Sequence, residues 1–576
     1  MVKKSIVIAL VVLLLLLSAC GNADNTAQPN NTTDSNVNTK NNAEPDPTAP
    51  PADPLGKYEQ PVTMTVGTCI EPTDETLPAG DTIEDNVFTR SIREDLNIDV
   101  KVYWSVSCGT NRNQKVSLAI ASNDLPDAMV VTAVELRQMA DADQLESLAA
   151  AYEMYAGDGV RGVIESTEGL ALQSATFDGK LLAFPSVTSR SDGTHLMWIR
   201  QDWLDKLNMD PPKTIDDLEK VALAFKNDDP DGNNQADTFA ITGPQTGGHL
   251  SSGFLRSTNN PFGFDPVFSA FKAHPGHWVE GPDGKAIYGS ILPETKEALA
   301  KLRDWYSKGL IDPEMGIRKQ ASEPIVAGRS GIFFGMWWAG FTPIPDAIKE
   351  NPKASWQAYA LPLDNEGQFN PHINTPSTRF VVVRKGYKHP EAVVKIQNWL
   401  YLNEDRIEAE SGVHTSNIPI RITLDRFDKF EGEVDLLQKV LFDGASTDTL
   451  KPENQPFNPT LMAEYENALK VKKEPYDNNN IEYWDVEADG GVFPRTYARL
   501  VGGKALLGPM NRVSSLIYSQ TKTMESRWVN LEKLEEETFM KIIMGVEPVD
   551  SFDQFVSDWK NQGGDTITSE VQATLE

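Results

Sequence analysis

Apolar and polar positions alternate in short blocks from about residue 60, and the blocks predict β–α–β units. The stretches "VTMTVGTC" (62–69) and "IDVKVYWSVSC" (98–108) have the alternation and β-branched content of strands. Between them Phe88, Ile92 and Leu96 recur every four residues, which is typical of one face of a helix. The pattern therefore predicts strand, helix and strand in that order.

The alternation continues with a helical stretch at 115–121, the apolar strand "LPDAMVVT" (125–132) and a helix from Ala133. This order predicts an open parallel sheet flanked by helices. Ligands of such sheets bind beyond the carboxyl ends of the strands. The turns at 71–74, 107–111 and 132–135 are therefore expected to line a binding cleft.

A second set of strands and helices begins near residue 196. Apolar strands are expected at 196–199 and 331–336, and helices from Asp202 and at 293–308. Thr214 and Asp217 form a capping-box pattern before the apolar positions of another helix. Beyond the strand in "TRFVVVRKG" (378–386), a helix is expected at 390–402, and the chain is mainly helical from about residue 435.

The N-terminus has the features of an export signal. Lys3 and Lys4 precede an apolar run at 6–17, and "LSAC" ends at Cys20. This tetrapeptide resembles the lipobox of bacterial lipoproteins, so residues 1–19 are expected to be a signal peptide and Cys20 the lipidated residue. The apolar run is shorter than the roughly 20 residues that span a bilayer. Residues 20–54 lack aromatic side chains, which predicts a disordered tether.

Size and charge narrow the function classes. The residues beyond the tether, from 55 to 576, are more than one hydrophobic core usually supports, so at least two lobes are expected. The formal net charge of −30 argues against a nucleic-acid partner and against electrostatic attachment to anionic lipid. It favours a soluble, monomeric body held to the membrane through its N-terminal lipid alone.

Cys69 and Cys108 remain after Cys20 is assigned to the lipid. Both follow predicted strands of the same β–α–β unit, in a compartment where disulfides persist. A disulfide between them is expected, and two separate buried thiols are the alternative.

A calcium loop is predicted in "DDPDGNNQADT" (228–238). Calcium is held by oxygen atoms from alternate residues of a 12-residue loop. Counted from the first position, the ligands would be Asp229, Asp231, Asn233, Gln235 and Asp237. Asn234 replaces the usual Gly at position six and Ala240 replaces the usual Glu at position twelve, so a solvated turn without metal is the alternative.

Several segments together resemble the extracellular solute-binding proteins of carbohydrate ABC importers, in the large Gram-positive lipoprotein branch related to alginate-binding proteins. The resemblance rests on the lipobox, the tether and the order of "MWIRQDWLDKLNM", "DPDGNNQADTFAI", "LRDWYSKGLIDPE", "RSGIFFGMWW" and "FDQFVSDWKNQGGDTITSEV". It implies a periplasmic-binding-protein-like α/β fold of type II, with an interlobe cleft that closes on an oligosaccharide and performs no chemistry. Lobe 1 would comprise about 55–185 and 375–440, and lobe 2 about 186–374 and 441–576. ABC permease subunits are the implied partners, at the outer face of the cell membrane.

The resemblance also bears on individual residues. Family members carry calcium in a loop like 229–237, with an acidic residue where this chain has Thr238. A Trp after the matching strand stacks on a sugar ring, a role that transfers to Trp337. Trp338 follows directly, and strand alternation predicts that one indole faces the cleft and the other the core.

Sugar rings need aromatic plates and a few oriented polar groups. Besides the two tryptophans, the polar candidates are Glu71, Asp74, Asn123, Asp124, Thr132, Glu135, His195 and Arg379. Trp198 lies in an apolar stretch and is expected in the core.

Two other classes of protein stay open. An anchored glycoside hydrolase or lyase needs two suitably spaced carboxylates, which 83 acidic residues could supply, although no catalytic signature motif is present. A sugar-sensing surface protein or adhesin would use the same fold without transport.

Overall fold

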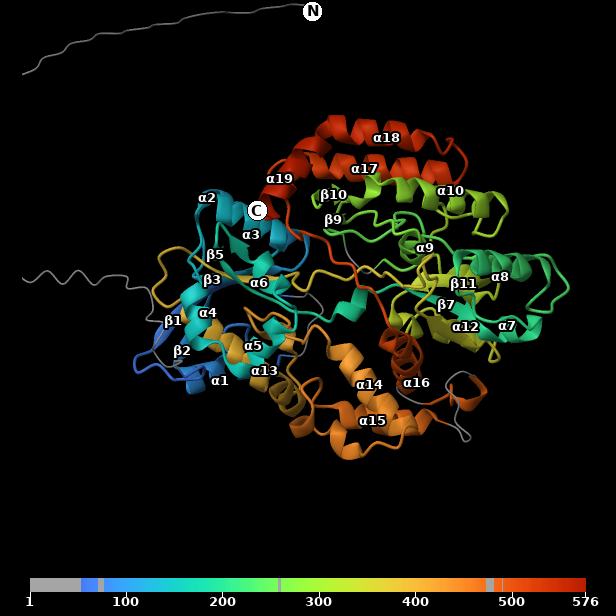
Figure 1. Ribbon diagram of the computed structural model, residues 1–576. Coiled ribbons are helices and arrows are strands. Elements are labelled where there is room, and N and C mark those ends of the chain that lie inside the picture. The colour runs from blue at the N-terminus through green and yellow to red at the C-terminus, as the bar shows by residue number, and fades with distance from the viewer. Residues whose placement is uncertain (1–52, 71–76, 257–259, 473–480, 489–490, 576) are drawn as a thin grey trace, which may run out of the picture. The chain divides into compact units, whose positions relative to one another are not determined.

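The computed structural model describes residues 53–70, 77–256, 260–472, 481–488 and 491–575 (Figure 1). These residues belong to one compact unit of the chain, 50–576. The predicted signal peptide, Cys20, nearly all of the tether, Glu71 and Asp74 lie outside the described residues. Among the described helices, none combines the length and the apolar character that a membrane span requires.

The first sheet has five strands in the order β2-β1-β3-β13-β6. Its strands are β1 (Val62–Ile70), β2 (Ile98–Ser107), β3 (Ala128–Val131), β6 (Ala183–Pro185) and β13 (Phe380–Val383). The strands β2, β1 and β3 are parallel, as the β–α alternation predicts. The strand β13 runs antiparallel to both β3 and β6, so the sheet is mixed.

Helices pack around this sheet, and their apolar faces form its core. They are α1 (Val87–Leu96), α2 (Thr110–Ser122), α3 (Ala133–Asp141), α4 (Ala149–Tyr155), α5 (Asp158–Glu165), α6 (Leu170–Ser174) and α13 (Glu391–Ser411). The helix α1 begins where the Asn86 side chain accepts the amides of Phe88 and Thr89. The predicted face of Phe88, Ile92 and Leu96 is buried. The short strands β4 (Thr176–Phe177) and β5 (Lys180–Leu181) form a hairpin.

The second sheet has four strands in the order β12-β7-β11-β8. They are β7 (Leu196–Arg200), β8 (Phe239–Ile241), β11 (Ser330–Gly335) and β12 (Trp356–Tyr359). Along β7 the side chains alternate between two cores: Met197 and Ile199 belong to one, and Leu196 and Trp198 to the other. The expectation that Trp198 is a core residue is confirmed, because its side chain is fully buried.

Helices cover both faces of the second sheet. They are α7 (Gln201–Leu207), α8 (Ile215–Asn227), α9 (Asp265–Ala270), α10 (Pro293–Ser307), α11 (Glu323–Val326), α12 (Ile344–Glu350), α14 (Lys429–Phe442), α15 (Leu461–Val471), α16 (Val492–Tyr497), α17 (Met524–Ile543), α18 (Ser551–Trp559) and α19 (Asp565–Leu575). The helix α8 starts with the predicted capping box of Thr214 and Asp217. The helices α10, α17 and α18 lie side by side (Figure 1), near the hairpin of β9 (Trp278–Glu280) and β10 (Ala286–Tyr288).

Three segments connect the two sheets and run beside one another; we call them the crossing segments. They are 186–195, 360–379 and 412–428, between β6 and β7, β12 and β13, and α13 and α14. The Ser186 amide donates to the Arg379 carbonyl at 2.9 Å, and the Arg190 amide donates to the Phe427 carbonyl at 2.9 Å. The fold is thus α/β with two sheets joined by the crossing segments; the first sheet packs on one core, and the second has a separate core on each face.

Cys69 and Cys108 form a disulfide with an S–S distance of 2.12 Å. Cys69 lies near the end of β1, and Cys108 directly follows the neighbouring parallel strand β2. Their Cα atoms are 4.9 Å apart. The disulfide therefore joins the carboxyl end of β1 to the start of α2.

Candidate ligand-binding site

Trp337 and Trp338 lie just beyond the carboxyl end of β11. The strand ends at Gly335, and residues Trp337–Gly340 form a short 3₁₀ helix, η3. Both indoles are half-buried. Strand alternation, on which the expectation of one cleft-facing and one core-facing indole rests, therefore does not apply to the pair, because β11 ends two residues before Trp337.

Both tryptophans are hydrogen-bonded to Asp192 in the first crossing segment. The Trp337 Nε1–H donates to Asp192 Oδ1 at 3.1 Å, and the Trp338 Nε1–H donates to the Asp192 carbonyl at 3.3 Å. Asp192 belongs to the 3₁₀ turn η1 (Arg190–Gly193). Sequence reasoning missed Asp192, because 145 residues separate it from Trp337 and no local pattern marks it.

Aromatic and charged groups surround the tryptophan pair. Trp337 stacks on Phe430, with ring centroids 3.7 Å apart, and packs edge-on to Phe341. Next to Phe430, Glu431 accepts hydrogen bonds from Arg190 at 2.7 Å and from Arg512 at 3.3 Å. This arrangement places an aromatic surface beside carboxylate and guanidinium groups, which is the chemistry that sugar rings require.

Burial raises the pKa of the Asp192 carboxyl above its ordinary value. The Trp337 hydrogen bond opposes this rise, and the nearby carboxylates of Asp425 and Glu431 add to it. Asp192 is therefore held in a partly desolvated, acidic environment.

A second polar group lies at the carboxyl edge of the first sheet. Thr132 and Glu135 form the capping box of α3, and the Arg112 guanidinium binds both Glu135 oxygens, at 2.5 and 2.8 Å. Partial burial of the Arg379 guanidinium, and then the neighbouring Arg112, lower its pKa, and the Glu135 carboxylate opposes this. Thr132 and Glu135 thus have structural roles here, and the pattern T-x-x-E could have indicated this.

His195 is buried, and its side chain binds groups other than the tryptophan pair. Its Nε2 is 2.8 Å from the Asn260 carbonyl, and its Nδ1 is 3.7 Å from Asp265 Oδ2. Asp265 also faces His372, which lies 2.7 Å from His274. His195 therefore belongs to a buried histidine cluster rather than to an exposed surface.

Asn123 and Asp124 lie at the opposite edge of the first sheet from Thr132. Both precede β3, and they line a hollow of about 660 Å³ together with Arg384 and Lys385. The structure does not bring them together with the tryptophan pair. They lie at the amino end of β3, whereas ligands of parallel sheets bind beyond the carboxyl ends of the strands.

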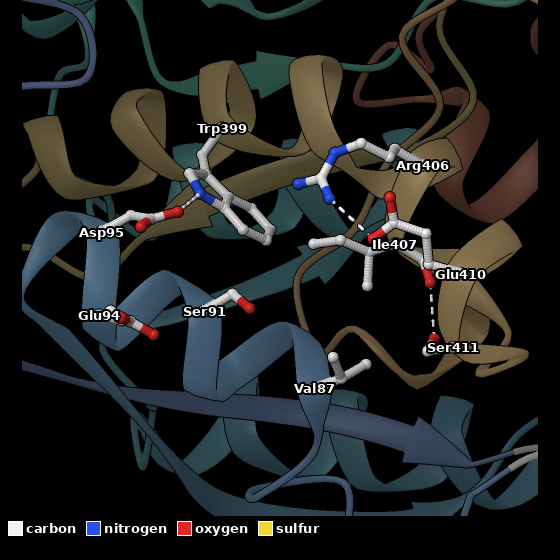
Figure 2. Close-up of a pocket in the computed structure, with 9 residues that line it drawn as sticks. All are labelled: Val87, Ser91, Glu94, Asp95, Trp399, Arg406, Ile407, Glu410 and Ser411. Carbon is white, nitrogen blue, oxygen red and sulfur yellow. Dashed lines mark hydrogen bonds and ion pairs between the residues drawn. The ribbon is translucent and has the colours of Figure 1, made fainter.

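Another hollow, of about 400 Å³, lies between α1 and α13 (Figure 2). Its polar groups pair with one another: the Trp399 indole donates to Asp95 at 2.7 Å, and Arg406 binds Glu410 at 2.9 Å. None of the predicted ligand-binding residues lines it. We assign no function to this hollow, because shape alone marks it.

The loop at 229–237 has part of the form of a calcium loop. Asn234 has a left-handed backbone with φ 61°, and its amide donates to Asp229 Oδ2 at 3.2 Å. The Asn233 amide group lies between the carboxylates of Asp231, at 2.8 Å, and Asp237, at 3.1 Å. Among the described residues, no group of three or more Asp, Glu, His or Cys side chains has the geometry of a metal site.

The far end of this loop differs from a calcium loop. Ala240, at position twelve, is buried in β8. The Thr238 hydroxyl donates to the Phe225 carbonyl at 2.8 Å rather than facing the loop. Ligands could therefore come only from positions one to nine.

The family model described as bacterial extracellular solute-binding protein matches residues 93–425, more than half of the chain. The chain belongs to this family. The two-sheet α/β fold agrees with this class of protein.

Curated relatives match over part of their length. The fructooligosaccharide ABC transporter substrate-binding protein FusA of Streptococcus pneumoniae serotype 4 (strain ATCC BAA-334 / TIGR4) is 33% identical over 213 residues, which cover 35% of this chain and 37% of FusA. The polygalacturonan/rhamnogalacturonan-binding protein YtcQ of Bacillus subtilis (strain 168) is 23% identical over 280 residues, which cover 48% of this chain and 50% of YtcQ.

Solved structures match over nearly the whole chain. FusA in complex with kestose has a TM-score of 0.52 at 16% identity, and covers 89% of this chain and 98% of its own. A solute-binding protein of Bifidobacterium longum infantis ATCC 15697, associated with an HMO-binding ABC transporter, has a TM-score of 0.55 at 14% identity, and covers 90% and 99%. These likenesses show the two-lobed periplasmic-binding-protein-like fold.

Proposed function

We propose that this protein is the substrate-binding subunit of an ABC importer, and that it captures an oligosaccharide between its two lobes and delivers it to membrane permeases. The observation that carries the proposal is the tryptophan pair at the carboxyl end of β11, beside Asp192, Glu431 and the arginines that bind Glu431. The proposal is supported by the names of FusA, a fructooligosaccharide transporter's substrate-binding protein, and of YtcQ, a polygalacturonan/rhamnogalacturonan-binding protein. No chemical step is proposed for the bound sugar.

The test is a binding screen on the mature protein, by calorimetry, with kestose, an oligogalacturonide and an alginate oligosaccharide. Saturable binding of at least one sugar is expected, with the sugar recovered unchanged. Release of new reducing ends would instead support the anchored hydrolase or lyase. Permease genes beside the coding gene would favour an importer over a sensor or adhesin.

Lipid attachment at Cys20 is part of the proposal. The lipobox "LSAC" and the apolar run before it support attachment at the outer face of the cell membrane. The curated relative LipO of Bacillus subtilis (strain 168) is named a lipoprotein, and is 27% identical over 240 residues.

We also propose that the loop at 229–237 binds a structural calcium ion. Asp229 Oδ1 is buried and accepts no hydrogen bond from any donor among the described residues, which fits a ligand oxygen. The other ligands would be Asp231, Asn233, the Gln235 carbonyl and Asp237. Among the similar structures are an EF-hand mutant of FusA and an alginate-binding protein, AlgQ2, without its calcium ion. The ion would fix the turn between α8 and β8 and take no part in binding the sugar.

A further inference from the structure

We infer that Asp192 is the residue that positions the tryptophan pair. It is a positioning residue rather than a sugar ligand, and the inference rests on the proposed function. One residue accepts both indole N–H groups, with its carboxylate for Trp337 and its backbone carbonyl for Trp338. An indole has a single donor, so each of these hydrogen bonds fixes how its ring is turned.

Asp192 is itself held firmly. The next residue, Gly193, packs so closely that a Cβ atom there would lie 1.6 Å from Asn374 Oδ1, in the second crossing segment. Arg190, two residues before Asp192, donates its amide to the Phe427 carbonyl in the third crossing segment and binds Glu431 through its side chain. Asp192 therefore occupies a fixed place where the crossing segments meet.

The tryptophans are confined from the other side as well. The Trp337 carbonyl lies so near Gly502 that a Cβ atom there would be 2.4 Å away. Phe430 covers one face of the Trp337 ring, whereas Trp338 has no stacked ring partner among the described residues. Asp192 thus completes the support of Trp337 and provides the polar anchor of Trp338.

The two hydrogen bonds can be tested separately, because one uses the Asp192 side chain and the other its backbone carbonyl. Replacing the Asp192 side chain removes the acceptor of Trp337 but leaves the backbone carbonyl that binds Trp338. The side-chain variant should therefore move Trp337 alone. Because Asp192 lies in a crossing segment, a shift of that segment during lobe closure would carry both rings with it.

The experiment compares Asp192→Ala, Asp192→Asn and the control Asp425→Ala in the full mature protein. Asp425 is a neighbouring carboxylate that pairs with Lys429 and does not bind either indole. The proteins carry 5-fluorotryptophan, and the Trp337 signal in ¹⁹F NMR is assigned with Trp337→Phe. Affinity for the oligosaccharide found in the screen is measured by calorimetry, and melting curves verify folding.

Asp192→Ala is expected to shift the Trp337 signal and to weaken binding about tenfold, as loss of a hydrogen bond to a charged group does. Asp192→Asn retains an acceptor oxygen and should stay within about threefold of the wild type. The control should match the wild type. In the Trp337→Phe background, which lacks the donor, Asp192→Ala should cause no further loss of affinity.

An unchanged Trp337 signal in Asp192→Ala would overturn the inference without reference to any ligand. Unchanged affinity in Asp192→Ala, while Trp338→Ala loses binding, would overturn the inference and leave the proposed function in place. A wild-type protein that binds none of the sugars would count against the proposed function, and with it against a positioning role in sugar binding. If Asp192→Ala does not fold, Asp192→Leu, which has the branched shape of Asp and also lacks the acceptor oxygen, replaces it in the same comparisons.

Discussion

The indole of Trp337 lies over the ring of Phe430, with the two planes 24° apart and the ring centroids 3.7 Å apart. One face of Trp337 is therefore covered by protein, and a sugar could stack only on the other. Trp338 has no such partner among the described residues. The two neighbouring tryptophans should respond differently to replacement.

For Trp338→Ala we expect a loss of affinity of about thirtyfold for the oligosaccharide, because buried aromatic anchors contribute about 2 kcal/mol or more to binding. Its melting temperature should change little. Trp337→Ala should weaken binding and also lower the free energy of unfolding by about 1 to 3 kcal/mol, because it removes the Phe430 stack and apolar burial. Calorimetry and urea titration measure both effects. Normal binding by both variants would exclude the pair from the site.

The buried histidines predict a loss of stability in mild acid. Burial, and then the neighbouring His372, lower the pKa of His274 to about 3, and burial also holds the pKa of His277 well below 6.5. Between pH 6.5 and about 3 the unfolded chain therefore binds more protons than the folded chain. The contribution of these two histidines to the free energy of unfolding is fully present above pH 6.5. It falls as the pH decreases, by about 1.4 kcal/mol per pH unit for each histidine.

Urea titrations at pH 7.5, 6 and 5 check this slope. A His274→Gln variant should lose about half of the contribution of the pair, and His389→Gln, at a half-buried histidine outside the cluster, serves as the control. Equal slopes for all three proteins would show that the cluster titrates normally.

Local signals in the sequence predicted many elements of the fold. The four-residue spacing of Phe88, Ile92 and Leu96 predicted α1, and the Thr214–Asp217 pair predicted the start of α8. These succeeded because cap and period act within one or two turns. The strand β11 was predicted one residue from its observed place.

The site was less predictable, because its contacts join distant parts of the chain. Asp192 lies in the first crossing segment and Phe430 in α14, directly after the third. Both contact Trp337 although they are far from it in the sequence. His195 is a polar residue and was expected to contact the ligand, but the fold buries it beside Asp265. Periodicity predicts which face of an element is buried, and does not show which distant residue it meets.

The disulfide should contribute strongly to stability. It closes a loop with a sequence separation of 39 residues, and the chain-entropy model gives about 4 kcal/mol for a loop of this length. The variant with both Cys69 and Cys108 replaced by Ala should unfold at lower urea concentration by a corresponding amount. A reducing agent should destabilise the wild type but not the double variant. Destabilisation of both by the reductant would point to an effect outside this disulfide.

Membrane attachment is tested by Cys20→Ala in cells. Without the thiol no lipid can be added, so the body of the protein should move from the membrane fraction to the medium. Fractionation followed by immunoblotting measures the distribution, and Ser18→Ala is the control because it leaves the Cys in place. Retention of Cys20→Ala on membranes would contradict the lipid anchor.

The calcium loop gives the last prediction. A metal that binds only the folded state stabilises it by RT ln(1 + [L]/Kd), which is about 2.7 kcal/mol at a hundredfold excess over Kd. Chelation with EDTA should therefore lower the melting temperature, and added calcium should restore it. Asp231→Ala should melt like the chelated wild type and no longer respond to EDTA. Asp283→Ala, an exposed carboxylate in the β9–β10 turn, should keep the full response.

The loop itself explains why the response should be moderate. Ala240 and Thr238 provide no ligand at its far end, so the ion would be held by the first nine positions alone. Fewer charged ligands mean weaker binding, and the concentration at which calcium restores stability should be correspondingly high. Sugar affinity measured with saturating calcium and after chelation should agree at a temperature where both forms are folded, because the ion fixes a turn and does not contact the ligand. Identical melting of the wild type, its EDTA-treated form and Asp231→Ala would show that 229–237 is a solvated turn.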